Sequence, residues 1–250
     1  MRRQMVFQRS AMMVAVAGLL AACQPVAYPA NGPVVQPLPL PVGAVPMTGD
    51  RLTEEQAARN FVAVVSRVEP VAEAMCRERN PRSNCDFQIV VDDRPDQPPN
   101  AFQTLDRSGR PIIGFTLALI ADARNADEIA FVVGHEAAHH VAGHIPQVQR
   151  TATTGAVLAG VLAQASGAPP EAVRAAQQMG ATMGARTYAR DFELEADALG
   201  AEIAFRAGFD PVRGAAFFTR LPDPGDQFLG SHPPNAQRQE TVRRVVAGLR

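Results

Sequence analysis

The fold of this chain is decided by the stretch DEIAFVVGHEAAH, residues 127–139. Asn125 stands just before it as a candidate N-cap, and Glu128 stands at the third helical position, the arrangement of a capping box. At 3.6 residues per turn, His135 and His139 lie one turn apart on the same face of the predicted helix. The two imidazoles can therefore point at one common atom.

The spacing of these residues is that of a zinc site. Two imidazoles one turn apart can bind a zinc ion at about 2.0–2.1 Å. Glu136 is adjacent and leans to the side of the metal, so we expect its carboxylate near a water molecule rather than on the zinc. Zinc lowers the pKa of such a water towards about 7, and the carboxylate can take its proton as the water attacks a carbonyl carbon. We therefore predict His135 and His139 as metal ligands and Glu136 as the general base.

A catalytic zinc usually has three protein ligands, so another residue must contribute. One class of zinc peptidase places a glycine three residues, and a third histidine six residues, after the second histidine. Here those positions hold Ala142 and Ile145, which excludes that class.

The later segment RDFELEAD, residues 190–197, offers carboxylates instead. Glu193 and Asp197 are one helical turn apart on one face. Glu193 can bind the zinc, and Asp197 can then accept a hydrogen bond from the outer nitrogen of a ligand histidine and fix its tautomer. Glu195 points elsewhere on the helix and is the weaker ligand candidate. The alternative for these acids is a solvated helix face.

The predicted strands lie early in the chain and the predicted helices late. The first helix begins near Leu52, where Thr53 and Gln56 form a capping box, and runs towards Cys76 with a break before Pro70. This order predicts an α+β fold, mainly helical with a small β-sheet. The expected strands are 87–91, 100–105 and 111–115, and the later helices are 126–143, 147–166, 170–187, 188–207, 211–220 and 234–248.

The N-terminal residues indicate export. Residues 1–22 combine three arginines with a short apolar run, which is typical of a signal peptide and falls short of the about 20 apolar residues that span a membrane. The run ends in Leu-Ala-Ala before Cys23, which resembles the bacterial lipobox, in which the cysteine is lipidated. The proline-rich stretch 23–50 predicts an extended leash that reaches roughly 80 Å at about 3.1 Å per residue. The folded domain is then 51–250.

The two remaining cysteines, Cys76 and Cys85, can close a short loop. An oxidising envelope compartment favours a disulfide between them. Two free buried thiols are the alternative.

Composition limits the class of protein. A hydrophobic content of 46 % fits a globular domain with a sizeable core. The formal net charge of -1 argues against a nucleic-acid binder, which usually shows a basic excess. The segment 151–166, rich in Ala, Gly, Val and Leu, fits either a buried helix or a helix that touches a membrane. Its Ala and Gly content also suits a tightly packed helical hairpin, and its length favours packing in the core.

The motifs together resemble the gluzincin family of CAAX prenyl proteases, heat-shock membrane proteases and periplasmic quality-control proteases. The residues that carry the resemblance are HEAAH at 135–139, His144 five residues later, and Glu193 with Glu195, Ala196 and Asp197. The similarity covers roughly 51–248 of this chain. It implies a zincin-like metallopeptidase domain with one zinc ion.

Two further segments match the same family. Asn100, Ala101 and Phe102 resemble its edge strand, where the backbone of a substrate is expected to add as a β-strand. The late segment SHPP, residues 231–234, together with Arg238, resembles its His-Pro segment. By analogy His232 either stabilises the oxyanion of the reaction or occupies the zinc as a self-inhibiting plug. A histidine in an ordinary surface loop is the alternative.

The expected function is that of a zinc-dependent endopeptidase of the bacterial envelope. The resemblance implies polypeptide substrates among misfolded envelope proteins. A lipid on Cys23 would tether the chain to a membrane on the periplasmic side, and Gln24 favours the outer membrane because aspartate at that position is associated with retention in the inner one. The alternatives are a chaperone or assembly factor with little proteolysis, a zinc hydrolase acting on a non-peptide bond, and a structural lipoprotein without zinc.

Overall fold

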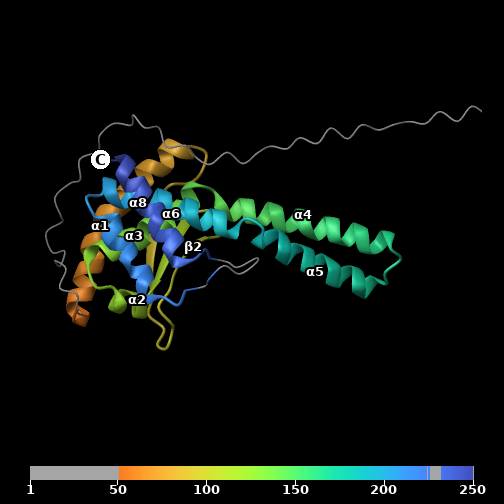
Figure 1. Ribbon diagram of the computed structural model, residues 1–250, viewed down its shortest axis with the longest axis horizontal. Coiled ribbons are helices and arrows are strands. Elements are labelled where there is room, and N and C mark those ends of the chain that lie inside the picture. The colour runs from red at the N-terminus through yellow and green to blue at the C-terminus, as the bar shows by residue number, and fades with distance from the viewer. Residues whose placement is uncertain (1–50, 224, 226–231, 250) are drawn as a thin grey trace, which may run out of the picture.

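The computed structural model describes residues 51–223, 225 and 232–249. The predicted signal peptide, the lipidated Cys23 and the leash 23–50 lie outside the described residues. The described part is mainly helical with a small sheet, as predicted, and Figure 1 shows a body of packed elements from which two helices project.

The first helix, α1 (Glu54–Arg79), packs one face on the core through residues such as Val64 and Val68. Its N-terminus is closed by the predicted capping box of Thr53 and Gln56. The predicted break before Pro70 is wrong, because the helix runs through it. Pro70 is exposed, so water can satisfy the carbonyl group that loses its partner, while core contacts on both sides hold the helix straight.

Three strands form one sheet in the order β1-β3-β2. Strand β1 (Gln88–Asp92) runs parallel to β3 (Pro111–Thr116), and β2 (Ala101–Leu105) runs antiparallel to it. The turn between β2 and β3 is closed by the Asp106 carboxylate, which accepts bonds from the backbone N–H groups of Ser108 and Arg110. The three predicted strands are confirmed, and β2 lies at an edge of the described sheet.

A short helix, α2 (Leu117–Asp122), follows β3 directly and was not predicted. The Thr116 side chain ends the strand and caps the helix by accepting the N–H of Leu119 at 3.3 Å. Six residues are too few to show a helical repeat in the sequence.

The central helix is α3 (Ala126–Val141), which contacts α1, α6 (Ala189–Arg206) and the edge strand β2. Asn125 caps it as predicted by accepting the N–H of Glu128 at 3.0 Å. The other half of that capping box is wrong, since the Glu128 carboxylate pairs with Arg220 and accepts the N–H of Arg124.

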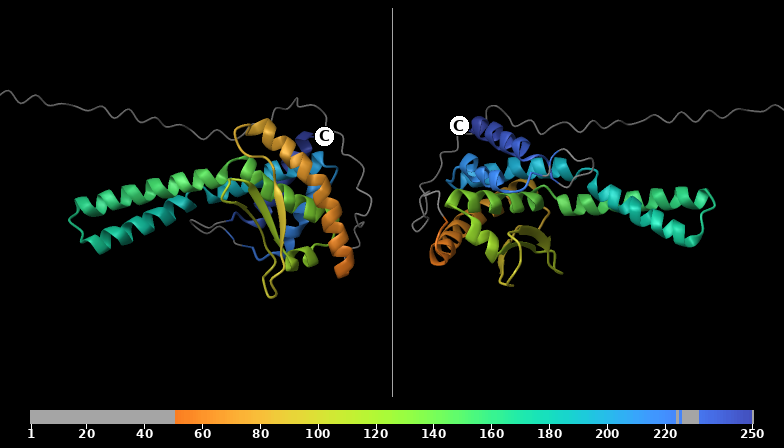
Figure 2. Two further views of the ribbon diagram at one scale, coloured as in Figure 1. Left: turned by 180° about the vertical axis from the view of Figure 1, so that it is seen from behind. Right: turned by 60° about the horizontal axis from the view of Figure 1, so that its bottom comes forward.

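Helices α4 (His144–Ala165) and α5 (Pro170–Arg186) form an antiparallel hairpin that projects from the body (Figures 1 and 2). The prediction of a tight hairpin is confirmed, but packing of 151–166 in the core is wrong, because only His144 and Gly160 of α4 are buried. Within the described ranges no helix has both the length and the apolar character needed to cross a membrane.

The chain then returns to the body. The single helix predicted for 211–220 is a short turn of α-helix, α7 (Pro211–Gly214), followed by a 3-10 helix, η1 (Ala215–Arg220). Gly214 lies directly on α3, because a Cβ atom there would stand 2.5 Å from the Asp127 carbonyl oxygen. The last helix, α8 (Asn235–Leu249), lies across α6.

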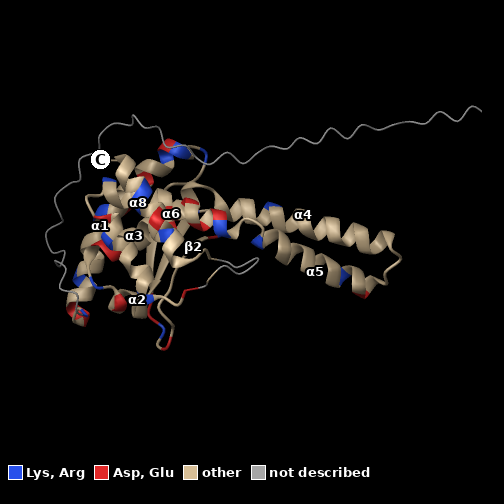
Figure 3. Cartoon of the chain, in the orientation of Figure 1, with Lys and Arg blue, Asp and Glu red and all other residues tan. Residues whose placement is uncertain are grey.

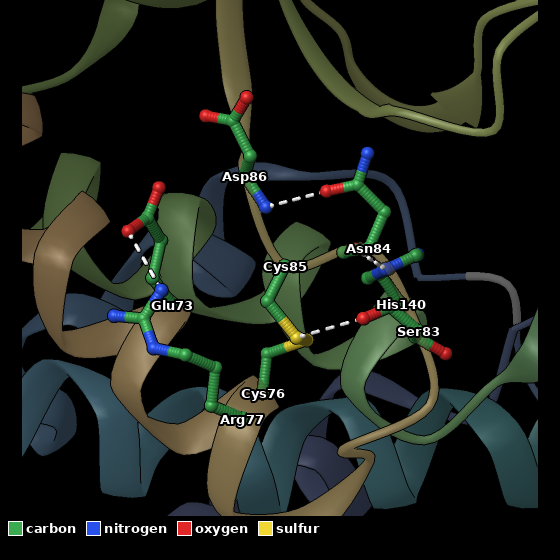
Figure 4. Close-up of a disulfide and its surroundings, with 8 residues drawn as sticks. All are labelled: Glu73, Cys76, Arg77, Ser83, Asn84, Cys85, Asp86 and His140. Atoms are coloured by element: carbon green, nitrogen blue, oxygen red, sulfur yellow. Dashed lines mark hydrogen bonds and ion pairs between the residues drawn. A yellow bond between two sulfur atoms is a disulfide. The ribbon is translucent and has the colours of Figure 1, made fainter.

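The predicted disulfide between Cys76 and Cys85 is present and ties the end of α1 to the segment before β1 (Figure 4). The loop that it closes presents the Asn84 carbonyl oxygen to His140, whose Nε2 donates at 2.7 Å. The His140 ring also meets Phe87 edge to face at 5.5 Å. The disulfide therefore braces the C-terminal turn of α3, one residue beyond His139.

Candidate metal centre and active site

Helices α3 and α6 bring His135, His139 and Glu193 to one point. The Nε2 atoms of the two imidazoles lie 3.2 Å apart. Glu193 Oε2 lies 3.5 Å from His135 Nε2, and Glu193 Oε1 lies 3.5 Å from His139 Nε2. Three atoms that bind one zinc at about 2.0–2.1 Å in tetrahedral geometry lie roughly 3.4 Å from one another. The donor set and its spacing therefore fit a zinc ion.

The outer nitrogen of His135 is held by Asp197. Its Nδ1–H donates to Asp197 Oδ1 at 3.0 Å, which leaves the Nε2 lone pair directed at the common point. Arg238 donates to both oxygens of Asp197 at 2.6 and 2.7 Å and lies over the Phe218 ring, 3.8 Å from its centroid. Both charged groups are buried, so each compensates the burial of the other.

The outer nitrogen of His139 begins a second chain of contacts. His139 Nδ1 lies 2.9 Å from His144 Nδ1, and His144 Nε2 lies 3.1 Å from Glu195 Oε2. Because a carboxylate only accepts, His144 carries its proton on Nε2, and its Nδ1 accepts the proton of His139. This fixes the tautomer of His139 with its Nε2 lone pair towards His135. Stacking of the His144 ring on Phe192 at 4.5 Å holds the arrangement.

The pKa values of the facing imidazoles move in opposite directions. Burial alone lowers the pKa of His135, but hydrogen bonds to Asp197 and Glu193 outweigh it and raise that pKa to about 10. Burial and the charge of His135 lower the pKa of His139 to about 3. The pKa of Glu193 is likewise below its usual range, because bonds to His135 and His232 outweigh burial. The site thus favours one positive charge between the imidazoles, which a bound cation would supply.

Glu136 lines a cavity of about 250 Å³ together with His135 and Glu193. Burial raises the pKa of its carboxyl, as suits a group that must accept a proton and give it up again. The apolar part of the cavity lining is formed by side chains of α2, α3 and η1, namely Leu119, Phe131, Val132, Phe217 and Phe218.

The edge strand reaches the same cavity. Asn100 and Ala101 line it. Asn100 continues the pairing of β2 with β3, because its carbonyl oxygen accepts the backbone N–H of Thr116 and its own N–H donates to Thr116 Oγ1. The Phe102 ring lies instead on the sheet against Gly114, where a Cβ atom would stand 2.2 Å from it. The predicted segment 100–102 therefore lies beside the metal-ligand candidates, with its side chains divided between the cavity and the sheet.

His232 also lines the cavity, at its exposed rim. Its Nδ1 donates to Glu193 Oε2 at 3.0 Å, while 53 % of its side chain remains exposed. It is therefore a neighbour of the candidate ligand and not an isolated surface residue, in a position compatible with either of its predicted roles.

Sequence reasoning missed three features of the site. Arg238 was noticed in a motif, but its bonds to Asp197 were not foreseen. The link from His139 through His144 to Glu195 was also missed, although the five-residue interval after His139 was the available signal. The aromatic wall from 217–218 gave no signal, since it depends on how η1 folds back over α3.

Comparison with known proteins gives two matches to this chain. The model of a family described as "Peptidase family M48" matches residues 61–246. A protein of Vibrio cholerae serotype O1, provisionally named beta-barrel assembly-enhancing protease, is 37 % identical over 123 residues. That alignment covers 46 % of this chain and 25 % of the relative, so the chain matches about a quarter of the relative's length.

Proposed function

The chain belongs to peptidase family M48 and is a protease with a zincin-like fold, and we propose that it is a zinc-dependent endopeptidase. We further propose that it acts in protein quality control in the bacterial envelope. The observation that carries the proposal is the convergence of His135, His139 and Glu193 at one point, where His135 and Glu193 line the same cavity as the Glu136 carboxylate. The envelope location is supported by the export signals of residues 1–23 and by the name of the Vibrio relative.

In this proposal His135, His139 and Glu193 would hold a zinc ion, which would polarise the scissile carbonyl and make the attacking water more acidic. Glu136 takes a proton from that water as the new bond from oxygen to carbon forms. The same carboxyl then delivers the proton to the amide nitrogen as the bond from carbon to nitrogen breaks. Asp197 and Arg238 keep the His135 ring oriented throughout.

The substrate is a polypeptide in extended form. Strand β2 lies at the sheet edge beside the cavity, and an edge strand can pair with an added chain through backbone hydrogen bonds. The aromatic wall formed by Phe131, Phe217 and Phe218 then receives an apolar side chain next to the cleaved bond. Extended apolar segments are exposed in unfolded proteins, which suits misfolded envelope proteins as clients.

The test compares Glu136→Gln with Glu240→Gln, a matched change of an exposed glutamate on α8. Zinc content and the rate of cleavage of an unfolded outer-membrane β-barrel protein are measured for each. We expect Glu136→Gln to keep its zinc and to lose roughly a hundredfold to ten-thousandfold in cleavage rate, and Glu240→Gln to behave as the parent.

The second candidate function is that of an assembly factor, and the observation that favours it is the name of the Vibrio relative. It predicts that Glu136→Gln, with zinc still bound, supports β-barrel assembly in envelope extracts as well as the parent. If the purified parent cleaves no polypeptide and this variant is fully active in assembly, the protease proposal for the physiological role is wrong. Clients retained by Glu136→Gln in those extracts identify the substrates.

A further inference from the structure

The hairpin of α4 and α5 exposes large apolar side chains that the protein body does not cover. On α4, Val157, Leu158, Val161 and Leu162 are between 57 % and 61 % exposed. Their spacing places them on one side of the helix. On α5, Met179 and Met183 are also exposed, one turn apart. We call these six residues the hairpin surface.

The contact between the two helices is made by small residues instead. A Cβ atom added at Gly155 would lie 2.1 Å from the Gly180 carbonyl oxygen, and one added at Gly184 would lie 2.1 Å from that of Thr151. The backbones therefore touch directly at glycines, and the large apolar residues are left to the outside. A hairpin adapted to water does the reverse, whereas helices adapted to lipid pack through small residues and turn large apolar ones outward.

The distribution of charges on the hairpin also fits helices adapted to lipid. Residues 151–170 contain no Asp, Glu, Lys or Arg, so α4 carries no charge beyond Arg150. The charged residues of α5 are Glu171, Arg174 and Arg186, all exposed. Figure 3 shows α4 almost uncharged along its length, with basic residues near the base of the hairpin. In this hairpin an apolar helix lies beside a helix that carries charged residues, and basic residues are in excess. This pattern is typical of an element that lies in the interface of an anionic membrane.

We propose that the hairpin docks on the surface of a lipid bilayer, with the outer face of α4 at the boundary between headgroups and acyl chains. Neither helix needs to cross the membrane for this contact. The expected lipid on Cys23 and the predicted leash of 23–50, with an expected reach of roughly 80 Å, would keep the hairpin within range of a bilayer. The inference is independent of proteolysis, because none of its residues lines the active-site cavity.

The first test is flotation of the mature chain with Cys23→Ala, which has no lipid of its own, on vesicles. The vesicles are made of phosphatidylethanolamine and phosphatidylglycerol, with phosphatidylcholine vesicles for comparison. We expect flotation on the anionic vesicles and about a hundredfold weaker partitioning for Leu158→Gln with Leu162→Gln, since each leucine that enters an apolar phase accounts for about tenfold or more. The matched single changes are Val161→Gln on α4, which should weaken binding, and Val62→Gln on α1, which is 66 % exposed and should not.

A second measurement uses the absence of tryptophan from the chain. In the Leu162→Trp variant, vesicles should shift the emission to shorter wavelength and brominated lipids should quench it, whereas Val62→Trp should show neither effect. The proposal is overturned if the parent does not float or if the leucine substitutions leave flotation unchanged. It is also overturned if those substitutions instead abolish self-association in sedimentation or the binding of an unfolded protein client. Cleavage of a soluble peptide should be equal in all variants, which separates this outcome from failure of the proposed function.

Discussion

At the residue scale, the order of the site depends on Asp197. Its carboxylate is fully buried, accepts the Nδ1–H of His135 and compensates the buried charge of Arg238. A neutral amide at this position cannot do both, because one of its two groups is a donor.

We therefore expect Asp197→Asn to lower zinc affinity by about ten- to a hundredfold. It should also lower the free energy of unfolding by about 3–5 kcal/mol, because Arg238 stays buried without its anion. Competition with a chelating dye and urea unfolding of the metal-free protein measure the two effects. Asp191→Asn, an exposed change on the same helix, is the control, and equal results for the two variants would contradict this account.

Loss of the contact between His139 and His144 should have a different effect from the change at Asp197. His144→Phe keeps an aromatic ring against Phe192 but removes the acceptor that orients His139. We expect roughly tenfold weaker zinc binding with a far smaller loss of stability than Asp197→Asn, because the Glu195 carboxylate, which loses its donor, is 37 % exposed and can be solvated. Glu195→Gln should show the same effect more weakly, since this carboxylate is 37 % exposed. An unchanged zinc affinity in both variants would show that His139 needs no such support.

Within one helix, spacing is enough to predict which side chains share a face. That is why the pair His135 and His139, and the pair Glu193 and Asp197, could be identified from the sequence. No such rule predicts how one helix is rotated against another. Glu195 indeed points away from the ligand candidates, but its carboxylate meets His144, the first residue of α4, and only the folded structure reveals this contact.

At the element scale, the distance between α3 and α6 sets the size of the site. The two helices approach closely at glycines, where a Cβ atom on Gly134 would lie 2.6 Å from the Gly200 carbonyl oxygen. His135 follows the first glycine directly, so this approach determines how near Glu193 comes to the imidazoles.

Gly134→Ala should therefore push the helices apart. We expect overpacking to cost about 1–3 kcal/mol in the free energy of unfolding and the bound zinc to be lost at chelator concentrations that the parent withstands. Gly248→Ala on α8 is the control, because its Cβ atom meets nothing within 4 Å. That change should stabilise the helix by roughly 0.5–1 kcal/mol. Unfolding curves and zinc content of both variants test the contrast, and retention of parental stability and zinc by Gly134→Ala would refute it.

The elements themselves were largely predictable because caps and repeats are local. The exceptions have physical causes that lie outside the local sequence. Pro70 is tolerated inside α1 because it faces water, and α2 is too short to show a repeat. The hairpin was identified, but its outward apolar face was not, since composition alone cannot distinguish which side of a helix meets its partner.

At the scale of the whole molecule, we expect two independent features to direct the protein to a membrane. One is the predicted lipid on Cys23, and the other is the hairpin surface on α4 and α5. A covalently attached lipid holds firmly when it carries enough acyl chain, whereas an interfacial helix binds reversibly. The two should therefore differ in what they contribute: the lipid retains the chain, and the hairpin sets how the body lies on the surface.

Fractionation of cells tests this division in a two-by-two design. One arm replaces residues 1–22 by a leader that is not lipidated and changes Cys23 to Ala, and the other changes Leu158 and Leu162 to Gln. We expect the leucine changes alone to leave the protein in the membrane fraction, because the lipid suffices. The unlipidated protein should divide between membrane and soluble fractions, and adding the leucine changes should release it fully. If the unlipidated protein is already fully soluble, the hairpin contributes no retention, and the lipid alone accounts for the membrane location.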